Sequence, residues 1–335
     1  MAKRVLINKA NGATNYFAAP NKGYQFVASG SKLLDLCLGG GWPIGRVSNI
    51  VGDKSTGKTL LAIEAAANFA RQFPKGKIYY REAEAAFDPQ YAQALGMPVD
   101  RVDFGEDPIE TIEDLFEDLS AIVAKSKQPV LYIIDSLDAL TDRAELNRGF
   151  DEGSYGANKA KQLSKLFRML VRKIRTKQIL VMVISQVRDK MGVTFGRKVT
   201  RTGGHALDFY ASQTLYLANI GRIARTVKGQ KRVTAVRVRA MVDKNKVGLP
   251  FRGCDFAIRF GYGIDDVEAC LFFLRGANGL DDIGLGKGKI TSYLAWYDKQ
   301  PAQQRVNELR DIHNAVAKYW REIEESILPT SPKYG

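Results

Sequence analysis

Residues 52–59 contain the residue types of a phosphate-binding loop. Their sequence, Gly-Asp-Lys-Ser-Thr-Gly-Lys-Thr, fits the pattern G-x-x-x-x-G-K-[ST] in full. In such loops backbone N–H groups surround phosphates, the lysine neutralises the terminal phosphates and the last hydroxyl binds Mg²⁺. We expect Lys58 and Thr59 to have these two roles. The residues expected to contact the nucleotide are Gly52, Asp53, Lys54, Ser55, Thr56, Gly57, Lys58 and Thr59.

A second segment supplies a carboxylate for the same metal ion. Residues 130–135 form an apolar run that ends in Asp135, which predicts a buried strand with a carboxylate at its carboxyl end. Ligands of open α/β sheets bind at that edge. An aspartate in this position is often only a helix N-cap. Next to a phosphate-binding loop, Asp135 is instead expected to support Mg²⁺ coordination.

Alternating helical and β-branched segments are expected to position these groups. The loop lies between an apolar strand and a helix over residues 59–73. The alternation along the chain predicts an α/β fold with a mostly parallel central sheet flanked by helices. Residues 233–242 alternate in the manner of an antiparallel strand with a basic outer face. The other expected strands are 46–51, 77–80, 130–135, 179–185 and 213–218.

Composition limits the class of protein. A chain of 335 residues that is 45% hydrophobic can bury one large core and a satellite. Its 50 Lys and Arg against 36 Asp and Glu give a formal net charge of +14, which favours a polyanionic partner such as nucleic acid. No apolar run approaches the roughly 20 residues that span a bilayer, and a secretory signal is not evident. We therefore expect a cytoplasmic protein with no membrane partner.

The cysteines and histidines show no metal-binding pattern. Cys37, Cys254 and Cys270 are widely separated and form no C-x-x-C pair, which indicates reduced and mostly buried thiols. The two histidines are too few to build a metal site.

Three regions can be distinguished along the chain. Residues 1–25 are polar and weakly periodic, which predicts an extended arm. Residues 26–262 carry the alternating pattern of the nucleotide-binding core. After Gly261 and Gly263, helical segments broken by a Gly- and Lys-rich turn predict a small C-terminal α/β domain over residues 263–335.

Several sequence blocks resemble the RecA family, over residues 26–264 and more weakly to about residue 302. Residues 29–35 resemble the approach to the family's phosphate-binding strand, and residues 84–92 resemble the block that contains its catalytic glutamate. The most specific blocks are Ser-Gln-Val-Arg at 185–188, Gly192, Phe195-Gly196, Thr-Gly-Gly-His-Ala-Leu at 202–207 and Phe-Tyr-Ala-Ser at 209–212. The spacing of these blocks is more similar to bacterial members than to eukaryotic recombinases or hexameric helicases.

The resemblance implies a RecA-like P-loop ATPase core and an ATP-dependent DNA recombinase. Such a protein forms a helical homo-oligomeric filament on single-stranded DNA, hydrolyses ATP with Mg²⁺ and exchanges strands with homologous duplex DNA. Single-strand-binding and loader proteins are further candidate partners. The short, divergent form suggests a phage or mobile-element member, acting in the cytoplasm of a bacterial cell or of the host.

The resemblance also implies roles in catalysis. Glu84 matches the family's water-activating glutamate, with Glu82 as the local competitor and a solvated carboxylate as the alternative for both. Gln186 matches the residue that senses the γ-phosphate and orders the adjoining loop. Lys244 and Lys246 resemble two lysines that reach a neighbour's γ-phosphate, as arginine fingers do. Without the resemblance, such lysines are usually solvated.

Aromatic and acidic residues match the family's adenine and subunit contacts. Asp88 and Tyr91 match adenine contacts, although Asp88 followed by Pro89 is also a good helix start. Phe260 takes the place of a tyrosine near the base. Phe209 is the candidate contact with the next subunit, and a core phenylalanine is the alternative.

Two segments, near residues 142–157 and 188–202, are expected to bind DNA. The second combines five basic residues with apolar residues that can pack on bases. Charged runs are usually only solvated faces, but these lie in Gly-rich loops beside the nucleotide sensor. The turn with Lys287 and Lys289 resembles the family's duplex-capturing region, or is a simple surface loop. The expected DNA-binding residues are Lys161, Ser164, Arg168, Arg188, Asp189, Lys190, Met191, Gly192, Val193, Phe195, Arg197, Lys198, Arg201, Gly203 and Gly204.

The ends of the chain depart from the family pattern. Bacterial members open with an amphipathic helix that docks on the next protomer, and residues 1–25 lack that periodicity. Residues 16–19, Tyr-Phe-Ala-Ala, resemble the docking motif of eukaryotic recombinases, with an unstructured arm as the alternative. The last residues lack the family's acidic tail, so autoinhibition through such a tail is not expected.

Two other classes of function remain open. A ring-forming helicase shares this fold but normally uses an arginine finger where this chain has lysines. A non-catalytic recombinase-like accessory factor is the other alternative. Against it stands the complete set of Lys58, Thr59, Glu84, Asp135 and Gln186.

Overall fold

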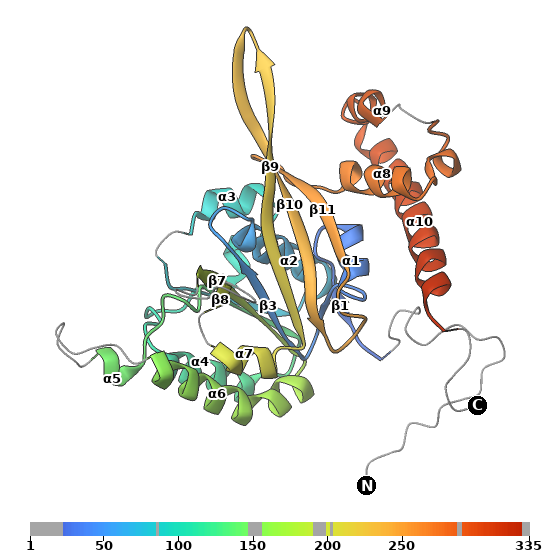
Figure 1. The fold of residues 1–335 in the computed structure, drawn as a ribbon. Helices are drawn as coiled ribbons and strands as arrows, with labels where there is room; N and C mark the ends of the chain where they lie inside the picture. Colours follow the sequence, from blue (N-terminus) through green and yellow to red (C-terminus); the bar gives the residue numbers. More distant parts are fainter. Residues whose placement is uncertain are drawn as a thin grey trace.

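The computed structural model shows one ten-stranded sheet at the centre of the protein (Figure 1). The structure describes residues 23–84, 87–146, 156–189, 199–201, 204–286 and 290–329. The strand order is β12-β11-β10-β9-β3-β7-β6-β4-β5, and β8 pairs with β7. The strands are β3 Val47–Gly52, β4 Lys77–Glu82, β5 Val102–Asp103, β6 Val130–Asp135, β7 Ile179–Asp189, β8 Val199–Arg201, β9 Gln213–Val227, β10 Gln230–Asn245, β11 Gly253–Arg259 and β12 Gly263–Asp265. A separate ribbon pairs β1 (Phe26–Val27) with β2 (Trp42–Pro43).

Helices cover both faces of the sheet. The α-helices are α1 Lys32–Cys37, α2 Lys58–Gln72, α3 Pro89–Ala94, α4 Ile112–Lys125, α5 Arg143–Leu146, α6 Gly156–Thr176, α7 Gly204–Tyr210, α8 Asp266–Gly276, α9 Ile290–Tyr297 and α10 Ala302–Ile327. Two short 3₁₀ helices are Val99–Arg101 and Leu280–Ile283. No helix in the described part of the chain has both the length and the apolar character to cross a bilayer.

The parallel part of the sheet has two hydrophobic cores because successive side chains point to opposite faces. Strands β9, β3, β7, β6, β4 and β5 run parallel. In β6, Leu131 and Ile133 pack in the core under α1 and α2, whereas Tyr132 and Ile134 pack in the core under α4, α6 and α7. This confirms the predicted α/β fold with a mostly parallel sheet.

All the predicted strands are present, but three extend by three or more residues beyond the predicted ranges. The strand expected at 179–185 continues to Asp189 and pairs with β8. The strands expected at 213–218 and 233–242 form one long hairpin of 15 and 16 residues. Beyond the body of the sheet both faces of this hairpin meet water, so no hydrophobic alternation marks its strands.

The turn of the β9–β10 hairpin follows from two residues with positive φ. Lys228 and Gly229 have φ values of +50° and +74°, and Val227 pairs with Gln230 across the turn. A two-residue turn with positive φ at both positions matches the right-handed twist of its strands. Figure 1 shows this hairpin, in yellow, projecting well beyond the rest of the sheet.

Residues 263–335 are the region predicted to form a small C-terminal α/β domain. Among its described residues, the one strand, β12, pairs antiparallel with β11 of the main sheet, and the remainder is helical or irregular. Leu271 of α8 and Ile312 of α10 belong to the same hydrophobic core as Leu34 of α1. In the described part of the region, α8 and α10 therefore share one hydrophobic core with α1.

Candidate active site

The phosphate-binding loop connects β3 to α2 at the carboxyl edge of the parallel strands. Ser55 and Gly57 have φ values of +56° and +90°, and such a turn directs backbone N–H groups inward. A Cβ atom on Gly52 would lie 2.6 Å from Thr56 Oγ1 and 2.9 Å from the Leu217 carbonyl oxygen, so no larger residue fits. The amino terminus of α2, with its positive dipole end, follows directly.

A hydroxyl and a carboxylate form the metal side of the site. Thr59 Oγ1 donates to Asp135 Oδ2 at 2.8 Å, and the Tyr80 hydroxyl donates to the same oxygen at 2.6 Å. Burial raises the pKa of Asp135, and the two hydroxyl donors partly offset this. Hydroxyl and carboxylate oxygens suit Mg²⁺, so Thr59 and Asp135 fit the predicted metal position.

The Lys58 ammonium lies among the loop carbonyls and the site carboxylates. Its Nζ donates to the Asp53 carbonyl oxygen at 2.8 Å. Burial lowers the pKa of Lys58, while the nearby carboxylates of Asp135 and Glu84 raise it. These carboxylates help to keep the group cationic, as neutralisation of a triphosphate requires.

Glu84 and Gln186, which are 102 residues apart in sequence, are in direct contact. Gln186 Nε2 donates to Glu84 Oε1 at 2.9 Å, and the Ser136 hydroxyl donates to the same oxygen. The Gln186 backbone N–H donates to Asp138 Oδ2 at 2.6 Å. The competitor Glu82 accepts the Glu84 N–H at 2.9 Å. The structure thus brings the predicted water-activating carboxylate and the predicted phosphate sensor together at the carboxyl ends of β4 and β7.

The predicted adenine contacts lie at the surface. Asp88 Oδ1 accepts the N–H groups of Gln90 and Tyr91, at 2.9 and 3.1 Å, and caps α3. Asp88 therefore has the structural role of a helix cap, and its adenine contact stays a prediction. Tyr91 and Phe260 are 38% and 58% exposed, which leaves aromatic surface for stacking on a base.

Glu64 is a half-buried carboxyl of α2 near Tyr91, and it gives the stability of the fold a pH dependence. Glu64 Oε1 accepts the Ile264 N–H at 3.0 Å, and burial raises the pKa of Glu64 from 4.5 to about 7. The folded chain therefore retains a proton that the unfolded chain loses, and stability falls as pH rises from about 4.5 to 7. For Glu64 the loss is roughly 3 kcal/mol.

We expect Glu64→Gln to make the pH dependence of stability shallower over this range. Urea unfolding at a series of pH values measures it, with the exposed Glu106→Gln as the matched control. Part of the slope is expected to remain, because burial also raises the pKa of Asp35 to about 7. Equal slopes for Glu64→Gln and the wild-type chain would contradict this assignment.

The two lysines predicted to act on a neighbour lie far from the phosphate-binding loop. Lys244 Nζ donates to the carbonyl oxygens of Asp208 and Phe209, and Lys246 Nζ donates to the Phe209 carbonyl oxygen at 3.0 Å. The Phe209 ring is 69% exposed and lies 5.8 Å from Lys246 Nζ, so Phe209 is not a core residue. These side chains form one cluster at the carboxyl end of α7, where cations are favoured.

The predicted DNA-binding residues lie on α6 and on the β7–β8 ladder. Lys161 and Arg168 are exposed and Ser164 is half-buried, while Leu163 and Phe167 of the same helix are buried. Residues 187–189 of β7 pair antiparallel with residues 199–201 of β8. The two ends of the segment predicted as a loop are therefore paired strands. Arg188, Asp189 and Arg201 lie on that ladder, and Gly204 begins α7.

Other DNA-binding predictions fall outside the described residues. These are Lys190, Met191, Gly192, Val193, Phe195, Arg197, Lys198, Gly203, Lys287, Lys289 and residues 147–155. The predicted protomer-docking residues 16–19 also lie outside the described residues. In the first predicted segment, Arg143 is bound to α4, because its Nη2 contacts Asp114 at 2.7 Å and Glu117 at 3.0 Å. Arg143 therefore serves to attach α5 to α4.

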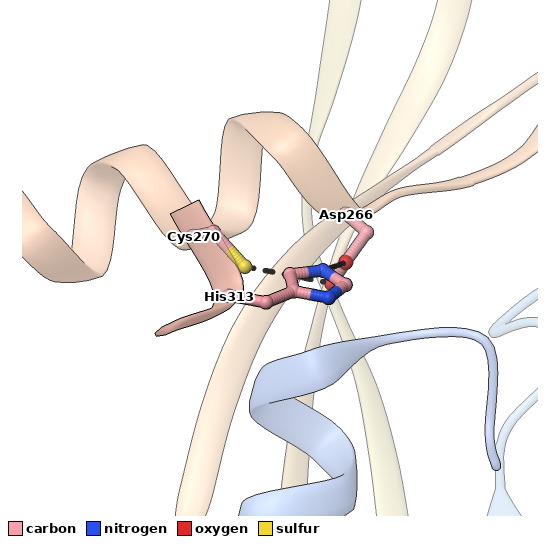
Figure 2. A group of neighbouring side chains, drawn as sticks. All are labelled: Asp266, Cys270 and His313. Carbon is pink, nitrogen blue, oxygen red and sulfur yellow. Dashed lines mark hydrogen bonds and ion pairs between the residues drawn. The ribbon is translucent and has the colours of Figure 1, made fainter. Parts of the chain in front are cut away.

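A second group of possible ligand atoms lies away from this site, where α8, α10 and α1 meet. Asp266, Cys270 and His313 place one ligand atom each within 4.8 Å of one another (Figure 2). Asp266 Oδ2 contacts His313 Nε2 at 2.6 Å, and Oδ1 accepts the Lys32 N–H at 2.8 Å and the Cys270 thiol at 3.7 Å. Burial raises the pKa of Cys270, so the thiol stays protonated. Hydrogen bonds account for this cluster, which joins α8 and α10 to the start of α1.

Three residues of the site had no role in our sequence analysis. Tyr80 holds Asp135, Ser136 holds Glu84, and Asp138 holds the Gln186 backbone. The alternation in β4 could have indicated that Tyr80 is buried. Its contact with Asp135 depends on the pairing of β4 with β6, in which Glu82 lies beside Asp135.

A phosphate-binding loop, a hydroxyl–carboxylate pair for Mg²⁺ and a glutamate–glutamine pair at one sheet edge define a P-loop nucleoside triphosphatase. Comparison with known proteins gives the family. The model of the RecA N-terminal domain matches residues 8–265, and the chain belongs to the RecA family. It is an ATP-dependent DNA recombinase and a DNA-dependent ATPase that uses Mg²⁺.

Individual relatives match along most of their length. The chain is 36% identical to Protein RecA of Synechocystis sp. over 311 residues, which cover 87% of this chain and 84% of that protein. It is 32% identical to Protein RecA of Caulobacter vibrioides over 353 residues, covering 98% and 92% of the two chains. For Protein RecA of Streptomyces avermitilis the identity is 32% over 329 residues, covering 93% and 81%. The resemblance found in the sequence is thereby confirmed.

Proposed function

We propose that the protein forms helical filaments on single-stranded DNA in which neighbouring protomers share each ATP site. Within these filaments it would catalyse homologous pairing and strand exchange with duplex DNA. Single-strand-binding and loader proteins are proposed as further partners that control access to the single strand. The site of action would be the cytoplasm of a bacterium, or of the host for a phage-encoded member.

The proposal rests on one observation: within one protomer, the lysine cluster and the phosphate-binding loop lie at opposite edges of the parallel strands. Lys244 pairs with Thr214, which lies beside Asn49 near the start of β3. Lys58 follows the end of β3. The lysine cluster therefore lies at the amino edge of the parallel strands and the phosphate-binding loop at the carboxyl edge. A single protomer cannot bring these groups onto one triphosphate.

Stacking of protomers would complete the site. If the amino edge of one sheet faces the carboxyl edge of the next, Lys244 and Lys246 contact the neighbour's γ-phosphate and stabilise its charge in the transition state. The exposed Phe209 lies in the same interface. ATP would then hold the assembly together, and hydrolysis would loosen it.

The place of Gln186 in the chain supports a coupling between ATP binding and DNA binding. Gln186 contacts Glu84 through its side chain and lies in β7, immediately before the ladder with β8. A γ-phosphate that binds the Gln186 amide would favour one arrangement of this ladder and of the segment between its strands. ATP binding would in this way raise the affinity for single-stranded DNA.

Electron microscopy with single-stranded DNA and a slowly hydrolysed ATP analogue tests the assembly. We expect open helical filaments that require the nucleotide, and strand exchange with homologous but not heterologous duplex. Closed rings would support a ring helicase and contradict the filament. Absence of DNA-stimulated ATP hydrolysis would support an accessory factor.

A further inference from the structure

The cluster of Asp266, Cys270 and His313 places three kinds of metal ligand together. It combines a carboxylate and a thiol of α8 with an imidazole of α10, and one ligand atom of each lies within 4.8 Å of the others (Figure 2). Asp266 and Cys270 are four residues apart on α8, so their side chains share one face of the helix. Carboxylate, thiolate and imidazole are the groups that bind Zn²⁺ in proteins.

The distances between these atoms are close to those around a tetrahedral ion. Bonds of about 2.0–2.3 Å to Zn²⁺ place its ligand atoms roughly 3.3–3.6 Å apart. Cys270 Sγ lies 3.7 Å from Asp266 Oδ1, and His313 Nε2 lies 2.6 Å from Asp266 Oδ2. The first distance already fits such an ion. The second must widen by less than about 1 Å, which is a small shift for a side chain that is 29% exposed.

The surroundings orient the ligands and leave a path for an ion. Asp266 Oδ1 accepts the Lys32 N–H at 2.8 Å, the kind of second contact that orients a metal-binding carboxylate. Cys270 is fully buried, whereas His313 is partly exposed. An ion can therefore enter beside the imidazole. Water can fill its fourth position, as in zinc sites with three protein ligands.

Acidic groups near Asp266 favour a cation in this position. Burial is the main cause of the raised pKa of both Asp35 and Glu64, and the charge of Asp266 raises both further. Burial also raises the pKa of Cys270, and Asp266 adds to this effect. These groups therefore disfavour one another's ionised forms. A divalent cation beside Asp266 would stabilise the ionised forms instead.

We propose that Asp266, Cys270 and His313 bind one Zn²⁺ ion that fixes α10 to α8. On binding, the Cys270 thiol loses its proton to solvent and its sulfur bonds to the ion, while neutral His313 donates a lone pair from Nε2. The ion replaces the hydrogen bonds that hold the cluster without metal. Thiolate and imidazole favour Zn²⁺ over Mg²⁺, which prefers oxygen ligands. The site is therefore distinct from the Mg²⁺ position at Thr59 and Asp135.

Sequence patterns do not indicate this site. His313 lies 47 residues after Asp266, so the ligands meet only because α10 packs on α8 through residues such as Ile312 and Leu271. One of the two histidines and one of the three cysteines of the chain are used, which is why no spacing motif results. The inference does not depend on the proposed function, because it involves neither nucleotide nor DNA.

Zinc and cobalt binding to the full-length protein, without a histidine tag or nucleotide, tests the site. Co²⁺ bound to a thiolate absorbs intensely in the near ultraviolet, and competition with a chelating indicator gives the Kd for Zn²⁺. We expect one Zn²⁺ per chain, and a Kd at least about tenfold higher for Cys270→Ala and for His313→Gln. Excess Mg²⁺ should not displace the ion. Zn²⁺ should raise the Tm of the wild type and of neither variant.

The other cysteines and the other histidine provide matched controls. Cys254 is hydrogen-bonded to Cys37, and these two are the rival thiols of the chain. Cys254→Ala and His205→Gln each leave the proposed ligands intact, so both should bind Zn²⁺ and Co²⁺ as the wild type does. Loss of the cobalt absorption in Cys254→Ala, with retention in Cys270→Ala, would place the ion at the other thiols and contradict the proposal.

Three further results would overturn the proposal. These are absence of the cobalt–thiolate absorption in the wild type, its persistence in Cys270→Ala, and a Zn²⁺ affinity that His313→Gln leaves unchanged. The Tm measured without metal shows whether each variant folds. If Cys270→Ala does not fold, His313→Gln decides the question, because its amide can still contact Asp266 while its nitrogen no longer binds the ion.

Discussion

Replacing Lys58 by alanine is expected to reduce ATP hydrolysis on the order of a hundredfold or more and to abolish nucleotide-dependent DNA binding. Lys58 is a cation of the phosphate-binding loop; burial lowers its pKa, and the Asp135 and Glu84 carboxylates partly offset this. Without it, the negative charge of the triphosphate faces the two carboxylates and loses the lysine that lies beside them. Steady-state phosphate release and anisotropy with labelled single-stranded DNA measure the two effects.

The exposed Lys75→Ala serves as the control for the loss of a surface charge. It should retain both activities. Nucleotide-dependent DNA binding by Lys58→Ala would show that the loop does not control the DNA-binding segments, and would contradict the coupling through Gln186.

Glu84→Gln is expected to separate hydrolysis from binding. The carboxylate lies beside Gln186 and Ser136, where it can orient a water in line with the γ-phosphate. Its loss should lower the hydrolysis rate by about 10²- to 10⁴-fold, while Lys58, Thr59 and Asp135 still bind ATP. The protein should then remain on single-stranded DNA far longer than the wild type, which dissociation kinetics after dilution measure.

Glu82→Gln discriminates between the two neighbouring carboxylates. Glu82 accepts the Glu84 N–H and shapes the local turn, so its variant should keep most of the activity. A large loss with Glu82→Gln and a small one with Glu84→Gln would reverse the assignment. Rapid release of DNA by Glu84→Gln would contradict its role in hydrolysis.

Local patterns were sufficient to predict the phosphate-binding loop and six of the ten strands of the main sheet. The loop at residues 52–59 and the apolar strand that ends in Asp135 are each defined within eight residues, and their chemistry depends on short-range backbone geometry. The roles of Glu84 and Gln186 were inferred only from the family resemblance. Their contact was not predicted, because strand order decides which carboxyl ends become neighbours.

Features that depend on long-range packing could not be predicted. Leu271 of α8 and Ile312 of α10 pack in the same core as Leu34 of α1. No local pattern encodes that contact, because the three residues are far apart in sequence. The outer part of the β9–β10 hairpin has two solvated faces, so the residues after Leu217 and before Val233 lack the alternation that defined residues 233–242. The hydrogen bond from Tyr80 to Asp135 depends in the same way on the register of β4 against β6.

Mixing two inactive variants tests the shared ATP site most directly. Lys58→Ala protein lacks a working loop but keeps the lysine cluster, and the double variant Lys244→Ala and Lys246→Ala has the opposite defect. Each alone should hydrolyse little ATP with single-stranded DNA. An equal mixture should recover activity at up to about a quarter of its interfaces, the share for random assembly, because Lys58→Ala protomers can join the filament only beside neighbours that bind ATP. If the mixture is no more active than the two variants separately, the lysines do not act on a neighbouring protomer's nucleotide and the account is wrong.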